Sequence, residues 1–328
     1  MNPKQIRRQV ARLFPHRGPR STRVGIEHEL VTAEIGTGAA VPIDRIRAAT
    51  RHAPYAGHLT FEPGGQVELS LPCVPCPVAL GEAFRADVAA LRSDCAAIGV
   101  RLDATAVDPR PAEEIPLQLT SARYVAMQRH FDSIGPAGRT MMRRTASTQV
   151  CLDWWPGAAG LEQWRLLNAA GPFLAAAYAR TNGPTSRLAT WLSVDPSRTA
   201  FDDRLLRGDD PVTAYAEFAA RAAVFTTPGD VDPHLTTLFP PVRPRGRYLE
   251  VRFLDVQPVV AVEPLVATLS ALLYDDARRR AALRMLSGEV SQLGDLWCRA
   301  AAGDAGLREL GRELVSPART PSRLVGAA

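Results

Sequence analysis

Residues 61–71 read FEPGGQVELSL, and the rest of the chain can be arranged around this stretch. Because side chains on a strand alternate between its two faces, Glu62 and Glu68 are predicted to emerge on the same face. The segment 63–65, Pro-Gly-Gly, bends the backbone or lets it approach a neighbour closely. The opposite face carries apolar side chains that can pack on a core, namely Phe61, Val67, Leu69 and Leu71. Taken alone, the pattern fits either a functional site or a solvated sheet face with two surface glutamates.

Three other predicted strands also place polar residues on one face and apolar residues on the other. The polar pairs are Glu27 with Glu29, Gln149 with Asp153, and Glu250 with Arg252. His28 points to the opposite face and is predicted to be a core residue. Apolar residues spaced by three and four between positions 80 and 98 predict an amphipathic helix over the apolar side. We therefore predict an α+β fold, with a curved, mostly antiparallel sheet, helices packed on its apolar face and a concave polar face.

The length of 328 residues and the hydrophobic content of 46% fit a globular protein with a sizeable core. Since no linker or repeat divides the chain, we predict a single domain over residues 1–328, with a helical C-terminal part at about 260–328. No run of about eighteen apolar residues occurs, and the basic N-terminus lacks the apolar stretch of a secretory signal. We expect a cytoplasmic protein without membrane contacts.

The basic residues limit the kinds of site that this chain can contain. Lys4 is the only lysine among 39 basic residues, which excludes a P-loop, a pyridoxal phosphate Schiff base and a kinase strand lysine. Any nucleotide phosphates must then be held by arginines and metal ions. The net charge of +5 is spread along the chain, so no nucleic acid is expected as a partner. Five scattered cysteines, including Cys73 and Cys76, predict reduced thiols.

The glutamates of the predicted sheet indicate a metal site. Five of them on one face would repel one another strongly unless cations neutralised them. Ligation by oxygen alone suits Mg²⁺, or Mn²⁺ in its place, rather than zinc. Such ions together with arginines, in a chain with a single lysine, indicate phosphoryl transfer.

Six motifs, in order along the chain, resemble those of the plant-type glutamate–cysteine ligases. They are GIEHEL (25–30), EPGGQVELS (62–70), MMRRTASTQVCLDW (141–154), DPSRT (195–199), HLTTLFPPVRPRG (234–246) and YLEVRFLDVQP (248–258). The similarity runs from about residue 23 to the final helices, and it is greatest to the actinobacterial branch that makes γ-glutamylcysteine for ergothioneine. It implies a glutamine-synthetase-like catalytic domain, in which a curved antiparallel sheet forms half of an active-site funnel.

The resemblance also implies an ATP-dependent ligation, with glutamate, cysteine and ATP as small-molecule substrates. MgATP would phosphorylate the γ-carboxylate of L-glutamate, and the amine of L-cysteine would attack the acyl phosphate to give γ-glutamylcysteine, ADP and phosphate. Matching motif positions imply a set of metal ligands, with Glu62 also at the catalytic centre. This set is Glu27, Glu29, Glu62, Glu68 and Glu250.

The remaining matched positions imply contacts to the substrates and to ATP. Gln149 stands where related ligases have a neutral ligand or a phosphate contact. Arg252 is the second catalytic candidate, because a guanidinium there would stabilise the transferring phosphoryl group or hold the glutamate carboxylate. Arg144 matches an arginine of the family. Arg198 and Arg243, both predicted in loops, are candidates for nucleotide or glutamate binding.

Two departures from the family pattern leave the amine substrate open. The segment TTPGDVD (226–232) before His234 is short, and Cys151 stands where the plant enzymes have asparagine. A ligase that joins glutamate to another amine is therefore an alternative. A metal-dependent phosphodiesterase or nuclease and a non-catalytic binding protein are alternatives from other classes. A monomer or a homodimer is expected.

Overall fold

The computed structural model describes residues 2–14, 18–225 and 230–316, so the first four residues of the TTPGDVD segment (226–229) lie outside the described residues. Seven strands form one sheet in the order β2-β3-β1-β5-β7-β6, with β4 paired to β1. Their bounds are β1 (Val24–Glu34), β2 (His58–Phe61), β3 (Val67–Val74), β4 (Val100–Asp103), β5 (Thr148–Asp153), β6 (Val242–Pro244) and β7 (Tyr248–Val251). All six strand pairings are antiparallel, which confirms the predicted antiparallel sheet.

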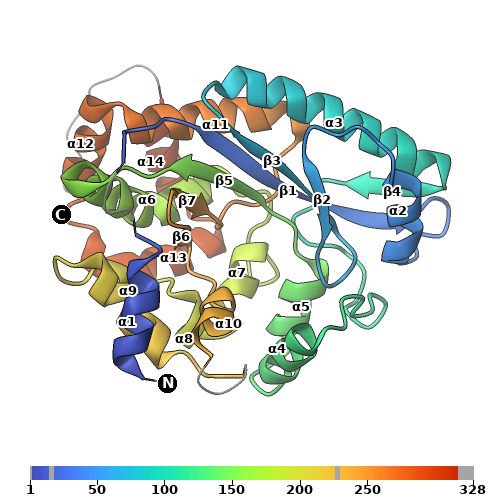
Figure 1. Ribbon diagram of the computed structural model, residues 1–328, viewed down its shortest axis with the longest axis horizontal. Helices are drawn as coiled ribbons and strands as arrows, with labels where there is room; N and C mark the ends of the chain where they lie inside the picture. Colours follow the sequence, from blue (N-terminus) through green and yellow to red (C-terminus); the bar gives the residue numbers. More distant parts are fainter. Residues whose placement is uncertain (1, 15–17, 226–229, 317–328) are drawn as a thin grey trace.

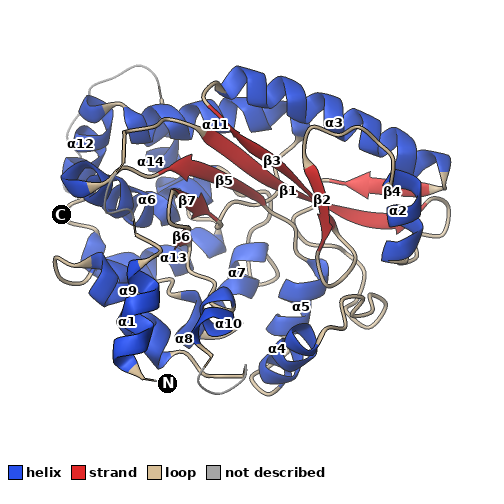
Figure 2. Cartoon of the chain, in the orientation of Figure 1, coloured by secondary structure: helices blue, strands red, loops and turns tan. Residues whose placement is uncertain are grey.

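Helices lie on both sides of this sheet (Figures 1 and 2). The first nine α-helices are α1 (Pro3–Ala11), α2 (Ile43–Thr50), α3 (Pro77–Ala97), α4 (Ala122–Asp132), α5 (Ala137–Arg144), α6 (Gly157–Ala177), α7 (Arg187–Leu192), α8 (Pro196–Thr199) and α9 (Pro211–Arg221). The others are α10 (Val231–Thr236), α11 (Val259–Tyr274), α12 (Asp276–Met285), α13 (Leu293–Ala302) and α14 (Ala305–Val315), with 3₁₀ turns η1 (Asp203–Leu206) and η2 (Val290–Gln292). Helices α11 to α14 thus occupy the C-terminal part of the described chain as far as residue 315.

Helices α3 and α11 cover the apolar face of the sheet, as predicted for the amphipathic segment 80–98 (Figure 1). Ile26, Leu69 and Val150 point into this layer and are almost completely buried, which contributes roughly 1.5–3 kcal/mol each. His28 belongs to the same layer: its Nδ1 lies 2.9 Å from Thr148 Oγ1, and its ring packs on Phe84. The prediction of a core histidine is confirmed, and the polar face is left to α4 and α5.

The stretch 61–71 is a hairpin rather than the single strand that alternation predicted. It includes the end of β2, a turn over residues 62–66 and the start of β3. The Gly65 N–H donates to the Glu62 carbonyl at 2.9 Å, and Gly65 has a φ of +93°, which favours glycine. A Cβ on Gly64 would overlap the carbonyl of Arg143, so the turn packs directly on the end of α5.

Two arginines also lie on different elements from those predicted. Arg198 lies in α8 and Arg243 on β6, whereas both were expected in loops. Asp195 explains the first difference, because its side chain accepts the Ser197 N–H and caps α8. Among the described residues, no helix combines the length and the apolar character needed to cross a membrane.

Candidate active site

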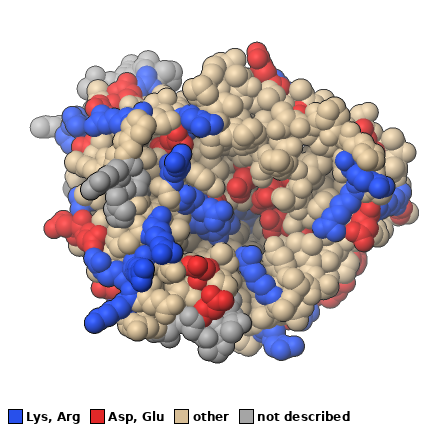
Figure 3. All heavy atoms as spheres, viewed as in Figure 1, with Lys and Arg blue, Asp and Glu red and all other residues tan. Residues whose placement is uncertain are grey.

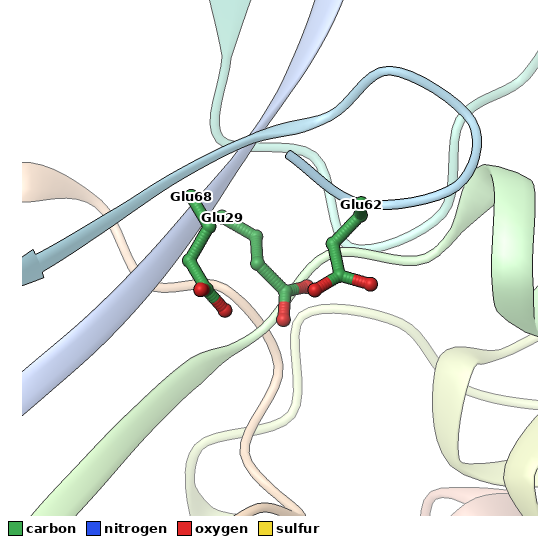
Figure 4. A group of neighbouring side chains, drawn as sticks. All are labelled: Glu29, Glu62 and Glu68. Atoms are coloured by element: carbon green, nitrogen blue, oxygen red, sulfur yellow. The ribbon is translucent and has the colours of Figure 1, made fainter. Parts of the chain in front are cut away.

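Three carboxylates meet at the edge of the polar face (Figure 4). Glu29 on β1 lies opposite Glu68 on β3 in the strand register, and the turn of the hairpin brings Glu62 beside them. One oxygen from each carboxylate can be chosen so that all three lie within 4.8 Å of one another. Although Glu62 is not on a strand, the hairpin gives it the position that the sequence pattern predicted. Three acids at this spacing can hold one cation between them.

The protonation of these acids reflects their burial and their mutual repulsion. Burial, followed by the charge of Glu29, raises the pKa of Glu62 to about 7. Burial, followed by the charge of Glu62, also raises the pKa of Glu68 well above its ordinary value. The pKa of Glu29 is raised by burial, although Arg187 and hydrogen bonds from Ser147 oppose this rise. The carboxylates therefore favour a proton or a metal ion as a counter-charge.

Neighbouring donors orient two of the three carboxylates. The backbone N–H and the hydroxyl of Ser147 each donate to Glu29 at 2.8 Å. Thr60 on β2 donates its hydroxyl to Glu68 at 2.6 Å. Each carboxylate keeps a second lone pair or a second oxygen for another partner. Such support from outside the cluster is typical of carboxylates that bind metal ions.

Arginines gather at the other end of the same face. Glu250 on β7 is buried and forms ion pairs with Arg243 at 3.5 Å, with Arg245 at 3.6 Å, and with Arg252. Burial, followed by the charge of Arg243, lowers the pKa of Arg252 to about 9. Its guanidinium nevertheless remains charged at neutral pH.

Gln149 on β5 joins the two ends. It accepts a hydrogen bond from Arg252 at 2.7 Å and donates one to Glu29 at 3.0 Å. Glu27 lies directly opposite Gln149 in the register of β1 and β5. The polar face thus runs from acids through an amide to arginines. An anionic ligand on this face could contact a metal ion bound by the acids at one end and the arginines at the other.

A cavity of about 160 Å³ lies over this arrangement. Its charged and amide side chains are Glu27, Glu62, Glu68, Gln149, Arg123, Arg243 and Arg252. Helices α4 and α5 supply its opposite wall, including Tyr124 and Met141. Figure 3 shows acidic and basic side chains around a hollow near the middle of this face of the molecule. We refer to this cavity, together with Glu29 beneath it, as the acidic pocket.

Comparison of this chain with known proteins identifies its family. A model of the glutamate–cysteine ligase family 2 (GCS2) matches residues 23–312. The chain belongs to this family. Its membership confirms the resemblance that the six motifs predicted, including the starting point near residue 23.

Relatives of this GCS2 member include bacterial and plant enzymes. The chain is 34% identical to the glutamate–cysteine ligase EgtA of Mycolicibacterium smegmatis, over 77% of this chain and 69% of that one. It is 32% identical to EgtA of Mycobacterium tuberculosis H37Rv, over 84% and 73%. The chloroplastic glutamate–cysteine ligase of Arabidopsis thaliana is 29% identical, over 69% and 50%. A bifunctional glutathione synthetase from Pasteurella multocida matches in structure with 9% identity and a TM-score of 0.48, over 94% and 48%, which is too distant to support an argument.

The fold of this GCS2 member brings most of the predicted site residues together. Glu27, Glu29, Glu62, Glu68, Gln149, Arg243 and Arg252 all lie in the acidic pocket or directly against it. Glu250 lies behind the arginines, and its carboxylate is engaged by them rather than by the other acids.

Arg144 and Arg198 do not line the acidic pocket. Arg144 donates to the Asp108 carbonyl at 3.0 and 2.7 Å and lines a separate cavity of about 830 Å³. Arg198 is fully buried, donates to Thr237, and lies over the Phe225 ring at 4.3 Å. The Asp108 carbonyl and Thr237 hold these two guanidiniums away from the acidic pocket.

Three residues of the site could not be identified from the strand patterns. Arg123 and Tyr124 lie on α4, and Arg187 lies at the start of α7. Arg187 is buried and donates to the carbonyls of Arg252 and Phe253. No local periodicity marks these positions, because helix residues meet a sheet face only through the tertiary fold. These three residues also lie outside the six matched motifs, so the motifs did not indicate them either.

Proposed function

We propose that this GCS2 member joins L-glutamate to L-cysteine with ATP and gives γ-glutamylcysteine, which serves ergothioneine or a related thiol. The observation that supports it most is the convergence of Glu29, Glu62 and Glu68 beside Arg243 and Arg252 on one sheet face. The similarity to EgtA supports the choice of substrates. A cytoplasmic location and a single catalytic domain over residues 1–328 are parts of the same proposal.

The acids of the pocket suit a hard divalent cation. The donor set of Glu29, Glu62 and Glu68 is oxygen only, which fits Mg²⁺, or Mn²⁺ in its place, better than softer metals. Glu27 completes the proposed ligand set, with Gln149 as a neutral contact, whereas the arginines engage Glu250, which the motif positions had implied as a ligand. When bound, the ion would neutralise negative charge on the phosphates of ATP. Holding it also offsets the burial and the repulsion from Glu29 that together raise the pKa of Glu62.

In the first chemical step, a γ-carboxylate oxygen of glutamate attacks the terminal phosphorus of ATP. The new bond joins that oxygen to phosphorus, the bond to the bridging oxygen breaks, and ADP leaves with the electron pair. Arg252, the residue after β7, lines the pocket and stabilises the charge that spreads over the transferring phosphoryl group. Gln149 holds this guanidinium through its amide oxygen, and Glu250 holds it from behind.

In the second step, the cysteine amine attacks the acyl carbon of γ-glutamyl phosphate. A C–N bond forms, the C–O bond to the phosphoryl group breaks, and phosphate leaves while the amine releases a proton. Arg243 and Arg123, which line the same cavity, are placed to hold carboxylate groups of the amino acid substrates. The walls contributed by α4 and α5 keep bulk water from the acyl phosphate.

The test measures ADP release on adding glutamate, with and without cysteine, and identifies the product by mass spectrometry. Glu62→Gln and Arg252→Ala should each lower the turnover about 100-fold or more. Glu114→Gln and Arg129→Ala, at exposed positions outside the pocket, are the matched controls and should retain full turnover. Thermal unfolding of each variant confirms that it is folded.

Three results would contradict the proposal at different levels. Full turnover in both pocket variants would refute the site assignment. Ligation of another amine in place of cysteine would refute only the substrate. Hydrolysis of a phosphodiester without ATP and glutamate would refute the ligase reaction itself.

A further inference from the structure

The wall opposite the sheet in the acidic pocket rests on a hydrophobic cluster of its own. Helices α4 and α5 supply this wall, and their buried side chains pack in a cluster that is separate from the core beneath the sheet. Because the two clusters are not continuous, contacts at the edge of the smaller one must set how α4 lies over the pocket. The buried members of the smaller cluster are Met127, Phe131, Met141, Met142, Trp191, Val194 and Phe239.

One such contact joins the end of α4 to α8. His130 lies in the last turn of α4, and its Nε2 lies 2.8 Å from a carboxylate oxygen of Asp195. Both side chains are mostly buried, with 18% and 7% of their surfaces exposed. Arg123 precedes His130 by about two turns of the helix, so the two side chains lie on the same side of α4. A contact that fixes His130 therefore also limits the rotation of α4 about its axis, and with it the direction of Arg123.

Asp195 is held firmly by partners other than His130. Its side chain accepts the Ser197 N–H at 2.9 Å, which caps α8, and the Ser197 hydroxyl at 2.6 Å. The buried Arg198 forms an ion pair with it at 3.5 Å. Burial alone would raise the pKa of Asp195, but hydrogen bonds to His130 and Ser197 lower it, so the carboxylate is ionised at neutral pH.

These contacts form a closed ring that passes through the acidic pocket. Arg198 donates to the carbonyl and to the hydroxyl of Thr237 at 3.0 and 2.7 Å. Arg123 donates to the carbonyl of Thr236 at 3.2 Å, and both of these residues line the pocket. Helix α4 closes the ring, since it carries the first and the last member. In order, the members are His130, Asp195, Arg198, Thr237, Thr236 and Arg123.

We infer that His130, through its bond to Asp195, positions Arg123 for the carboxylate of an amino acid substrate. His130 does not line the acidic pocket, so it is a positioning residue that acts through α4. The inference rests on the proposed function, in which Arg123 holds such a carboxylate. The competing interpretation is that His130 only fills space, because its ring also stacks on Phe225 with the ring centres 5.0 Å apart.

Two substitutions separate the hydrogen bond of His130 from its ring. His130→Gln keeps a side-chain N–H donor and removes the ring, whereas His130→Phe keeps a ring and removes the donor. In both variants Asp195 retains Ser197 and Arg198 as partners, so α8 stays capped. Arg129→Phe is the matched control, because Arg129 is the exposed neighbour of His130 on α4. Thermal unfolding shows whether each variant is folded.

Steady-state kinetics of the ligation give kcat and the KM of glutamate, cysteine and MgATP. Arg123→Ala should raise the KM of the amino acid whose carboxylate it holds. His130→Phe should raise the same KM about tenfold, while kcat and the KM of MgATP change less than about twofold. His130→Gln and Arg129→Phe should stay within about twofold of the wild type in every constant. In the Arg123→Ala background, His130→Phe should have no further effect, because the two residues act as one unit.

Three kinetic results would overturn the inference. The first is an unchanged KM of both amino acids in His130→Phe. The second is an equal increase in His130→Gln, because the ring rather than the hydrogen bond would then be what matters. The third is a full additional effect of His130→Phe in the Arg123→Ala background, because His130 would then not act through Arg123.

Crystal structures of the ligand-free wild type and of both His130 variants give a readout that needs no reaction. Arg123 should keep its bond to the Thr236 carbonyl in the wild type and in His130→Gln, and it should be displaced by about 1 Å or more in His130→Phe. If the wild type formed no γ-glutamylcysteine, the ligase proposal would fall, and these structures alone would decide whether His130 positions Arg123. If γ-glutamylcysteine formed but Arg123 stayed in place in His130→Phe, only the inference about His130 would fall.

Discussion

Replacing Glu62 by glutamine should stabilise the metal-free protein while it abolishes activity. Burial and the charge of Glu29 raise the pKa of Glu62 from 4.5 to about 7, which corresponds to about 3 kcal/mol of lost stability once the carboxyl is ionised. The folded state binds this proton more tightly than the unfolded state does. The cost is therefore absent below about pH 4.5, grows between pH 4.5 and about 7, and is complete above pH 7. Glutamine removes it.

Urea unfolding in the presence of EDTA measures this effect as the free energy of unfolding at pH 5 and at pH 8. The gain of Glu62→Gln over the wild type should be small at pH 5 and about 2–3 kcal/mol at pH 8. Adding Mg²⁺ at pH 8 should then stabilise the wild type and leave the variant nearly unchanged. Glu114→Gln, at an exposed position, is the control and should show no pH-dependent gain.

The reasoning would be refuted by an equal gain at both pH values, because the charge of Glu62 would then not be its source. A loss of stability at pH 8 would refute it as well, since the carboxylate would then be favourably paired in the folded protein. Equal stabilisation of both proteins by Mg²⁺ would remove Glu62 from the metal site.

Three further predictions concern the turn, the core and the arginine end of the site. Gly64→Ala should cost more than about 2 kcal/mol in urea unfolding and lower the activity, because its Cβ would overlap the Arg143 carbonyl, whereas Gly135→Ala has open space and should cost little. His28 has its pKa lowered to about 3 by burial, followed by the charge of Arg92, so folding excludes a proton that the unfolded chain binds below about pH 6.5. The free energy of unfolding should therefore fall by up to about 3 kcal/mol between pH 6.5 and 4. His28→Gln should make this fall smaller, which is measured as the change of the urea midpoint with pH. Glu250→Gln should lower turnover at least tenfold, since the arginines around it lose their shared anion. The Mg²⁺ stoichiometry should stay unchanged, and a reduced stoichiometry would instead assign Glu250 to the metal.

Alternation along strands was sufficient to predict which side of the sheet carries the chemistry. Glu27, Glu29 and Gln149 lie on β1 and β5, and the register of these two strands brings them together as their spacing predicted. For Glu62 the predicted strand was wrong, but the predicted neighbours were right. A tight hairpin places the first residue of its turn next to the strand that follows, so the two descriptions give similar positions.

Similarity of motifs predicted the family but not the direction of every side chain. The sequence around Arg198 matches the family, yet Asp195 and Thr237 bond its guanidinium inside the protein. Arg144 likewise turns toward the Asp108 carbonyl. Such directions depend on partners that are distant in sequence, which a local pattern cannot reveal. Arg123 could not be predicted for the same reason, because the packing of α4 over the polar face depends on contacts between residues distant in sequence.

The strand order explains how Glu29 and Arg252 can share one face without pairing directly, although Glu250 does pair with Arg252. β5 stands between β1, which carries Glu29, and β7, which leads into Arg252. If these two met directly, the arginine would satisfy the acid and both would be lost to ligands. Gln149 on β5 instead bonds Arg252 with its oxygen and Glu29 with its nitrogen, so the two side chains do not pair with each other. The acids are thereby left for cations and the arginines for anions, and a phosphate group that binds both must lie across the middle strand.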